Sequence, residues 1–134
     1  MTTVLNLVPE THLQLLTGRL TAVLTTVGSR QRPQSTAVWY LLGDDGELFC
    51  STTSTRQKYR NLLANPYAAF LVIDPNSPMC TLEVRARVEM IPDPDNARVA
   101  QLARAYGIEL AAITATPGDR YTLTLHPYRV IASP

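Results

Sequence analysis

Three cations cluster at the predicted start of a helix, where positive charge is normally unfavourable. Arg56, Lys58 and Arg60 fall within the first turn and a half of a helix predicted over residues 55–64. The N-terminal end of a helix carries a positive pole and unpaired N–H groups, so each cation there costs roughly a few tenths of a kcal/mol unless an anion lies nearby. Five hydroxyl residues, 51–55 (STTST), lead into this helix. The combination suits a phosphate ester; a solvated basic face on an exposed helix is the alternative interpretation.

The other reactive residue types form no recognisable catalytic or metal-binding motif. His12 and His126 do not stand at ligand spacing from another His, Cys or acidic residue. Cys50 and Cys80 lie thirty residues apart in apolar runs and are expected to be buried free thiols. The sequence has neither a G-x-S-x-G nor a G-x-G-x-x-G motif. We therefore predict no metal site and no catalytic side chain.

Charge and aromatic content argue against nucleic acid as a partner. Twelve Lys and Arg residues stand against eleven Asp and Glu residues, which gives a net charge of +1 and no broad attraction for polyanions. A small barrel that binds single-stranded nucleic acid needs aromatic platforms along a basic groove, and only 7% of the residues here are aromatic. Trp39 and Tyr40 are interpreted as core or interface residues rather than ring-stacking groups.

The length and the N-terminal segment predict one soluble cytoplasmic domain. A chain of 134 residues with 46% apolar residues fits a single globular domain over 1–134. Residues 1–10 lack the basic and apolar regions of a secretion signal, and no apolar run approaches the length that spans a bilayer. We therefore expect no membrane partner.

The first half of the chain predicts a helix followed by three strands in a meander. A short helix is expected before Gly18, and the strong turn signal Gly43-Asp44-Asp45-Gly46 separates the second and third strands. Polar residues 31–34 form the earlier turn. The predicted ranges are a helix over 9–17 and strands over 20–27, 35–42 and 47–53. Thr53, Ser54 and Thr55 are each expected to be able to cap the next helix.

The second half predicts three more strands and a second amphipathic helix. Residues 79–91 alternate between apolar and charged side chains, which is typical of a strand with one wet face. Residues 108–116 mix alanine with β-branched residues and receive no assignment. The predicted ranges are strands over 67–73, 79–91 and 120–132, the last interrupted at His126-Pro127, and a helix over 95–106. Six strands with singly inserted helices favour a mainly β, antiparallel barrel.

Several ordered blocks of the sequence resemble one family of cofactor-binding barrels. The blocks are a turn at 31–34 (QRPQ), DGELFCSTT at 45–53, TRQKYRNLLANPYAAFLVIDP at 55–75 and LEVRARVEMIPDPDNARV at 82–99. Together they resemble the pyridoxamine-phosphate-oxidase-like split-barrel superfamily, including its deazaflavin-dependent branch. The block STTSTRQKYRNLLANP is the most specific, because it resembles the strand and helix with which the family grips a phosphate.

The resemblance implies a six-stranded antiparallel split β-barrel that forms an intertwined homodimer and binds a flavin-type cofactor at the dimer interface. The deazaflavin coenzyme F420 is favoured over flavin mononucleotide (FMN). Lys58 would contact the cofactor phosphate, with Arg56 beside it. The other implied cofactor contacts are Ser51, Thr52 and Thr53 along the groove, Gln34, Ser35 and Thr36 at the ring edge, and Arg85 on the long strand.

The resemblance also implies a function for this protein, and one alternative function remains. The resemblance implies an oxidoreductase that transfers hydride between F420 or FMN and a small organic molecule. Arg85-Ala86 replaces an Arg-Gly pair that is frequent in the family, and no C-terminal basic motif indicates vitamin B6 as the substrate. The alternative function is a non-catalytic flavin or tetrapyrrole carrier or sensor on the same barrel.

Overall fold

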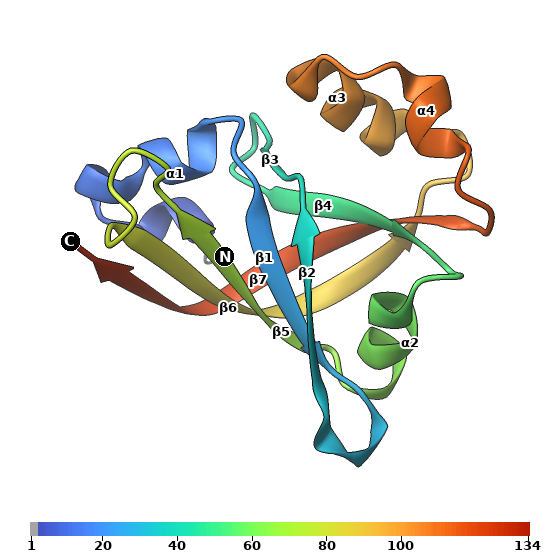
Figure 1. The fold of residues 1–134 in the computed structure, drawn as a ribbon, viewed down its shortest axis with the longest axis horizontal. Helices are drawn as coiled ribbons and strands as arrows, with labels where there is room; N and C mark the ends of the chain where they lie inside the picture. The colour runs from blue at the N-terminus through green and yellow to red at the C-terminus, as the bar shows by residue number, and fades with distance from the viewer. Residues whose placement is uncertain (1–2) are drawn as a thin grey trace.

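The computed structural model describes residues 3–134, and the first two residues of the predicted domain lie outside this range. One antiparallel sheet curls into a half-barrel, with helices at its ends and over its opening (Figure 1). The strand order is β2-β1-β5-β6-β7-β4-β3. The strands are β1 (Ala22–Val27), β2 (Pro33–Val38), β3 (Leu41–Leu42), β4 (Leu48–Thr53), β5 (Tyr67–Ile73), β6 (Thr81–Pro92) and β7 (Arg120–Ser133). This fold confirms the predicted mainly β, antiparallel class.

The helices are short and lie mostly at the edges of the barrel. Three single turns, η1 (Val4–Asn6), η2 (Glu10–His12) and η3 (Ser29–Gln31), accompany four helices. These are α1 (Gln14–Thr17), α2 (Gln57–Ala64), α3 (Ala97–Tyr106) and α4 (Leu110–Thr114). The helix predicted over 9–17 is therefore divided into η2 and α1, and the unassigned residues 108–116 contain α4. No helix in the described part of the chain is long and apolar enough to cross a membrane.

The sheet has seven strands rather than six because the strand predicted over 35–42 changes partner in the middle. Its first part, β2, pairs with β1, whereas β3 pairs with β4. At the crossing, the Tyr40 N–H donates to the Tyr106 hydroxyl at 3.3 Å, and that hydroxyl donates to the Leu20 carbonyl at 2.7 Å. A side chain from α3 thus satisfies backbone groups that a strand partner would otherwise satisfy.

The core fills the concave side of the sheet. Tyr40 and Phe70 are almost fully buried and meet edge to face, with ring centroids 5.0 Å apart. The Tyr40 hydroxyl donates to the Leu15 carbonyl, which ties α1 to the barrel. On β6, the alternate residues Leu82, Val84, Ala86 and Val88 are buried, as the predicted period of two requires.

Strand β7 runs without a break through the His126-Pro127 pair, where the sequence predicted an interruption. The register between β6 and β7 shifts here, with Pro127 opposite Ala86 and Arg129 opposite Arg85. Proline is tolerated at such a bulge because no regular ladder bond is needed from its nitrogen. On its other side, β7 pairs with β4 only as far as Leu125, so proline also sits at an edge.

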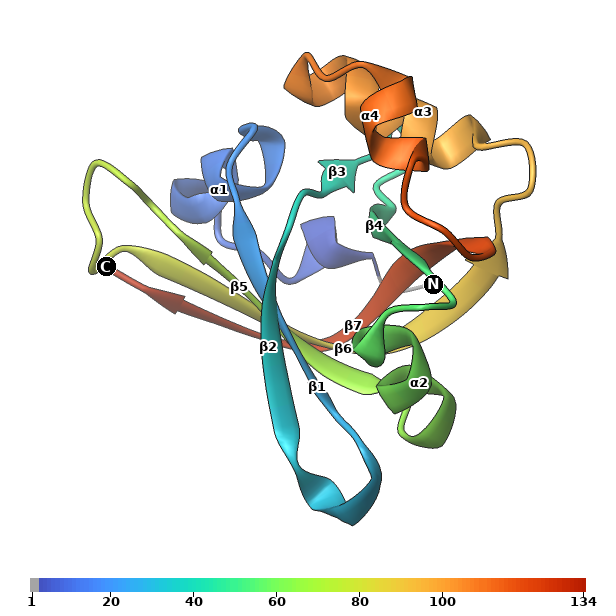
Figure 2. The same cartoon turned by 45° about the vertical axis from the view of Figure 1, so that its right-hand side comes forward.

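Helices α3 and α4 form an arm that stands away from the sheet (Figures 1 and 2). The arm is anchored at its start, where the buried Asp93 carboxylate accepts hydrogen bonds from the backbone N–H groups of Arg98 and Val99. The Arg98 guanidinium lies 4.4 Å from the centroid of the Phe49 ring on β4. The arm therefore has a fixed base on β4, while none of the residues of α4 is buried.

Candidate functional site

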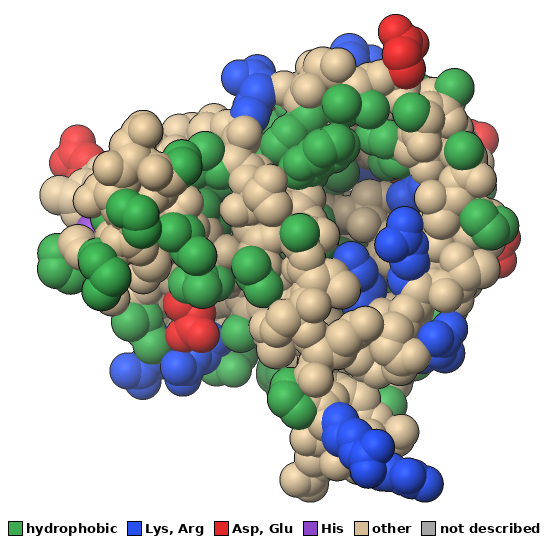
Figure 3. Space-filling model, viewed as in Figure 1, with side chains coloured by type: hydrophobic (Ala, Val, Ile, Leu, Met, Phe, Trp, Pro, Cys, Tyr) green, Lys and Arg blue, Asp and Glu red, His purple; other side chains and the backbone are tan. Residues whose placement is uncertain are grey.

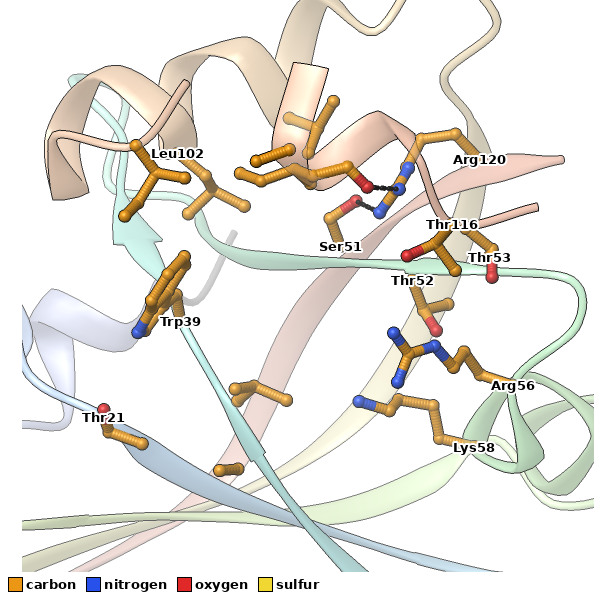
Figure 4. A pocket seen from close by; sticks show the side chains of 16 residues that line it. Thr21, Trp39, Ser51, Thr52, Thr53, Arg56, Lys58, Leu102, Thr116 and Arg120 are labelled. Atoms are coloured by element: carbon orange, nitrogen blue, oxygen red, sulfur yellow. Dashed lines mark hydrogen bonds between the residues drawn. The ribbon is translucent and has the colours of Figure 1, made fainter. Parts of the chain in front are cut away.

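A cavity of about 610 Å³ lies where the barrel is open, between β2 and β4 and beneath the arm (Figures 3 and 4). This volume falls within the range of about 300–1,000 Å³ that is usual for small-molecule sites. The lining residues come from five parts of the chain: Thr21 and Ala37–Trp39 near β2, Ser51–Thr53 of β4, Arg56 and Lys58 at α2, Arg120 of β7, and Val99, Leu102, Ile108, Ala112, Ile113 and Thr116 of the arm.

The two strands beside the opening each leave a backbone edge without a strand partner. Strand β4 pairs with β7 along its whole length, but β3 covers its other edge only at Leu48 and Phe49. The second edge of residues 51–53 is therefore free of strand pairing within the described sheet. Strand β2 likewise pairs with β1 alone. Backbone N–H and C=O groups thus remain available for a ligand at this opening.

Helix α2 is held firmly against the barrel behind the cavity. The buried Asn61 side chain donates from Nδ2 to Thr26 Oγ1 at 3.0 Å and accepts from Gln57 Nε2 at 2.7 Å. Gly28 permits this approach, because any Cβ there would collide with the Asn61 carboxamide. The first turn of α2 has no side-chain cap, and its cap position is Arg56. The helix therefore presents a fixed, uncapped N-terminal end at the cavity wall.

The predicted capping hydroxyls are bonded elsewhere. The hydroxyls of Thr53 and Thr55 hydrogen bond to each other at 2.8 Å, and Thr55 also donates to the Pro117 carbonyl. The Ser54 hydroxyl accepts from the Asp119 N–H at 3.0 Å. The prediction that one of these residues caps α2 is wrong, because Ser54 and Thr55 bond to the turn before β7 and the Thr53 hydroxyl bonds to Thr55.

Three cations meet at one end of the cavity. The Lys58 side chain is buried, with 8% of the residue exposed, and lies beside Arg56 (Figure 4). The Arg120 guanidinium donates to Ser51 Oγ at 3.2 Å and to the Ile113 carbonyl at 3.1 Å. No cavity-lining residue in the described chain is Asp or Glu, and none of the three cations forms an ion pair there. The cluster is therefore positive, and no carboxylate of the described chain lies within ion-pair distance of it.

The surroundings perturb the titration of this cluster. Burial lowers the pKa of Lys58; the Cys50 thiol opposes this shift, whereas Arg56 adds to it. Burial also lowers the pKa of Arg120, with Arg56 acting in the same direction and Asp93 against it. In both groups burial and a neighbouring cation disfavour the charged form, and a bound anion would reverse that effect.

One buried hydroxyl beside the cations has no hydrogen-bond partner. Thr52 is buried, and its Oγ1 contacts neither a donor nor an acceptor in the described structure. Thr52 lies on β4 and lines the same end of the cavity as Arg56 and Lys58 (Figure 4). A buried polar atom without a partner is costly, so a ligand that supplies an acceptor here would be favoured.

The structure brings together five of the nine residues predicted to bind the cofactor. Lys58, Arg56, Ser51, Thr52 and Thr53 all line the cavity. Arg60, the third cation of the predicted cluster, lies outside it and donates to the Thr55 carbonyl and Gln57 Oε1. Five of the predicted residues therefore share one side of this cavity, but the sequence pattern could not separate Arg60 from the two cations that line it.

The other four predicted residues lie away from this cavity within one chain. Gln34 lines a separate hollow of about 410 Å³ near the β1–β2 turn. The Ser35 hydroxyl hydrogen bonds to Thr25 Oγ1 at 2.7 Å, and the Thr36 hydroxyl is buried without a partner. Arg85 is on the outer face of β6, 2.9 Å from the Glu83 carboxylate. Within one chain, these four side chains therefore do not line the cavity that holds Lys58 and Arg56.

Sequence reasoning missed Arg120, helix α4 of the arm and the position of Trp39. Arg120 is opposite Thr53 in the β4–β7 ladder, a long-range pairing that no local pattern reveals. Its position directly after the Pro117-Gly118-Asp119 break was the available signal. Tyr40 is buried as predicted, whereas Trp39 is 39% exposed and faces the cavity.

The histidines are placed outside the cavity. His12 Nε2 is 2.7 Å from the Ser133 carbonyl, and His126 Nε2 is 2.8 Å from Glu89 Oε1. Across residues 3–134, no group of three His, Cys, Asp or Glu side chains is arranged to hold a metal ion. The site is therefore built from cations, hydroxyls and apolar side chains.

Comparison with known proteins gives one matching family and several similar structures. The family described as Pyridoxamine 5'-phosphate oxidase matches residues 8–133. A solved structure described as an F420 reductase is 38% identical, with a TM-score of 0.83; the alignment covers 92% of this chain and 98% of that one. A search of curated proteins finds no match.

More distant structures share the fold. A conserved hypothetical protein, Rv2991 from Mycobacterium tuberculosis, is 21% identical with a TM-score of 0.74, over 99% of this chain and 89% of that one. HutZ, the heme storage protein from Vibrio cholerae, is 20% identical with a TM-score of 0.72, over 92% and 94% of the two chains. At these identities the likeness extends to the split barrel and no further.

Proposed function

This chain belongs to the pyridoxamine 5'-phosphate oxidase family, and from that premise we propose that it is an oxidoreductase dependent on a flavin or deazaflavin. The proposed reaction is hydride transfer between F420 or FMN and a small organic molecule. The observation that carries the proposal is the group of three cavity cations, Arg56, Lys58 and Arg120, which lacks a carboxylate partner in the described chain.

The residues at the cationic end fit the phosphate of such a cofactor. Lys58 and Arg56 would donate charge-assisted hydrogen bonds to phosphate oxygens, and Arg120 would add a third positive group. The Thr52 hydroxyl, which lacks a partner, would gain an acceptor. The uncapped first turn of α2 would add its dipole and backbone N–H groups. Each of these features is unfavourable in isolation and favourable with an anion.

The protein's contribution would be binding, orientation and exclusion of water. A bound flavin or deazaflavin supplies the hydride chemistry itself. Residues of the arm, including Leu102 and Ile113, cover the cavity with apolar side chains that limit the entry of water. The cavity lining described here offers no His, Asp or Glu as a proton donor or acceptor. Catalysis in this proposal therefore needs no side chain as an acid or base.

F420 is the favoured cofactor, with FMN as the alternative. The preference is supported by 38% identity to a structure described as an F420 reductase, with nearly complete coverage of both chains. Both cofactors carry a phosphate and a tricyclic ring, so the cationic end of the cavity does not discriminate between them.

The proposal includes a homodimer. The cavity opens between β2 and β4, and four predicted cofactor residues lie outside it in one chain. A second copy related by a two-fold axis would offer a way to bring such residues to a shared cofactor. Sedimentation at working concentrations should therefore yield the mass of two chains, and a monomer that binds cofactor at full affinity would argue against this part of the proposal.

The second candidate is a non-catalytic flavin or tetrapyrrole carrier or sensor. It is suggested by the shared fold of HutZ, described as a heme storage protein. Against a histidine-ligated tetrapyrrole, neither His12 nor His126 lines the cavity. The oxidoreductase is preferred because the structure described as an F420 reductase is 38% identical to this chain, whereas HutZ is 20% identical.

Two measurements test the proposed function in sequence. The purified protein is titrated with F420, FMN and heme, and binding is followed by the absorption spectrum. We expect a submillimolar affinity for F420 or FMN and none of comparable strength for heme. The reduced form of the tighter cofactor is then supplied with a panel of organic acceptors. Oxidation faster than in free solution supports the enzyme, whereas binding without turnover for any acceptor favours the carrier.

A further inference from the structure

The end of the cavity away from the three cations is uncharged and has one large aromatic wall. Trp39 lines this end and is 39% exposed, although tryptophan is usually more deeply buried in a domain of this kind. Figure 4 shows its indole at the opposite side of the cavity from Lys58 and Arg56. An exposed indole inside a concave site leaves apolar surface in contact with water, which favours an apolar occupant.

The Trp39 ring is supported from behind by a second aromatic ring. Tyr106 of α3 is stacked on it, with centroids 4.9 Å apart and ring planes 17° from parallel. Tyr106 is itself fixed, because its hydroxyl donates to the Leu20 carbonyl at 2.7 Å and accepts from the Tyr40 N–H at 3.3 Å. Tyr106 therefore covers one face of the Trp39 ring and holds the ring in place. The other face can stack on a planar ligand with little loss of side-chain entropy.

The arm supplies the remaining walls of this end. Leu102 of α3 lies beside Trp39 (Figure 4) and is buried at 3% exposure, and Ile108, which follows α3, is half-buried. These side chains are aliphatic, so they can pack against the edge or second face of a ring but cannot pair with a charge. The cavity therefore has a positive end and a neutral end, and the neutral end has the flat surface.

We propose that Trp39, backed by Tyr106, is a stacking platform for a planar, uncharged fused ring at the neutral end of the cavity. Trp39 would contact the ring directly, and Tyr106 would act as a positioning residue. The inference rests on the proposed function, since a flavin-type cofactor and an acceptor with a conjugated ring are the two sources of such a ring there. It replaces the interpretation of Trp39 as a core or interface residue.

The test uses planar probes that carry no phosphate, so that the cationic end takes no part in binding. The probes are lumiflavin, which has the flavin ring without the phosphate-bearing chain, and acridone, which has three fused rings without flavin chemistry. Binding is measured by calorimetry for the wild-type protein, Trp39→Leu and Trp39→Phe. We expect Trp39→Leu to weaken both probes about tenfold or more, and Trp39→Phe to weaken them less, because phenylalanine keeps a flat face.

A second arm identifies the source of the ring. Acridone is titrated into protein saturated with F420 or FMN. If acridone is displaced, the cofactor's own ring occupies the Trp39 platform. If acridone still binds and Trp39→Leu still weakens it, the platform serves a second molecule, the acceptor. Both results are consistent with Trp39 as a stacking platform and differ only in which molecule supplies the ring.

The role of Tyr106 has its own spectroscopic signature. Trp39 is the only tryptophan in the chain, so the protein's tryptophan fluorescence reports on this ring alone. Tyr106→Leu removes the stacked ring, and Tyr106→Phe keeps it while removing the hydroxyl. We expect Tyr106→Leu to lower the fluorescence anisotropy of Trp39 and to increase its quenching by acrylamide. Tyr106→Phe should restore most of the wild-type values, and Trp39 fluorescence unchanged in Tyr106→Leu would contradict a positioning role.

The platform is overturned if Trp39→Leu, folded as judged by circular dichroism and thermal unfolding, binds both probes as tightly as the wild type does. It is also overturned if neither probe binds a wild-type protein that binds F420 or FMN. The proposed function fails separately, when neither cofactor binds or when Lys58 does not contribute to their affinity. The two failures are distinguishable because the probes lack the phosphate that Lys58 is proposed to hold.

Discussion

Two cations outside the cavity, Arg85 and Arg98, have carboxylate partners, and the three cations of the cavity do not. Arg85 lies 2.9 Å from Glu83 on the outer face of β6, and Arg98 lies 3.1 Å from Glu47 at the base of the arm. The cations of the cavity have no such carboxylate. The buried Lys58 has no ion pair although the more exposed Arg85 and Arg98 do, which is the reverse of what stability alone favours, since burial makes an unpaired charge more costly.

The difference indicates that the cavity cations serve binding rather than folding. Arg98 combines its ion pair with a contact over the Phe49 ring, so both of its interactions stabilise the arm. Lys58 is more deeply buried than Arg98 and has no ion pair. Burial and the neighbouring Arg56 both lower the pKa of Lys58 and thus disfavour its charged form. A protein keeps such an arrangement where a ligand supplies the missing charge. The predictions that follow test this contrast.

The largest effect is expected for removal of two cavity cations together. Arg56→Ala with Lys58→Ala should weaken the affinity for F420 or FMN about a hundredfold or more, because two charge-assisted hydrogen bonds to phosphate are lost. The matched control is Arg60→Ala with Arg87→Ala, which removes the same charge from two exposed residues that do not line the cavity. The control should change the affinity less than about threefold. Equal losses in the two double variants would mean that the net charge, and not the cavity, attracts the cofactor.

Removing a cation should change the stability of the unliganded protein in opposite directions at Lys58 and at Arg98. Lys58→Met keeps the volume but removes a buried, unpaired charge, so it should raise the free energy of unfolding by about 1 kcal/mol. Arg98→Ala removes an ion pair and a ring contact and should lower it by about 1 kcal/mol. Urea unfolding of both variants measures the difference. A loss of stability in Lys58→Met would show that Lys58 contributes to folding after all.

The stability of the unliganded protein should also depend on pH, because the folded protein lowers the pKa of Lys58. The pKa of Lys58 is lowered from 10.5 in the folded protein, mainly by burial. Between the lowered value and 10.5, the unfolded chain holds a proton that the folded chain has released, so stability rises with pH in this window. The stability advantage of Lys58→Met over the wild type should therefore shrink as pH rises toward 10.5. An advantage independent of pH would assign the gain to packing instead of charge.

The smallest effect is expected from salt. The cavity is partly open to solvent, so added salt screens its attraction for a phosphate only in part. Affinity for F420 or FMN should fall roughly two- to fivefold between about 50 and about 300 mM sodium chloride. In Arg56→Ala with Lys58→Ala this dependence should be shallower, and an unchanged slope would argue against phosphate contact at these two residues.

Local patterns predicted the elements that carry regular periodicity. The strand predicted over 67–73 coincides with β5, and the helix over 95–106 differs from α3 by two residues at its start. The positive cluster at the start of α2 was also apparent, because helix signals and charges are both local. These features depend on neighbours within about ten residues along the chain.

Features that depend on distant contacts could not be predicted. The division of the strand over 35–42 depends on Tyr106, sixty-six residues beyond Tyr40 in sequence. Arg120 joins the site through its pairing with Thr53 and its hydrogen bond to Ser51. Helix α4 has only five residues, LAAIT, which are too few to show a helical period. In the first two cases long-range structure, not the local sequence, decides the outcome.

The central claim, that the unpaired cavity cations hold a phosphate, is tested most directly by a cycle in Lys58 and the phosphate. Affinities are measured for FMN and for riboflavin, which lacks the phosphate, in the wild type and in Lys58→Ala. The same comparison applies to F420 and its phosphate-free deazaflavin core. We predict that the wild type prefers the phosphorylated compound and that Lys58→Ala reduces this preference about tenfold. A preference that is the same in both proteins would contradict the account.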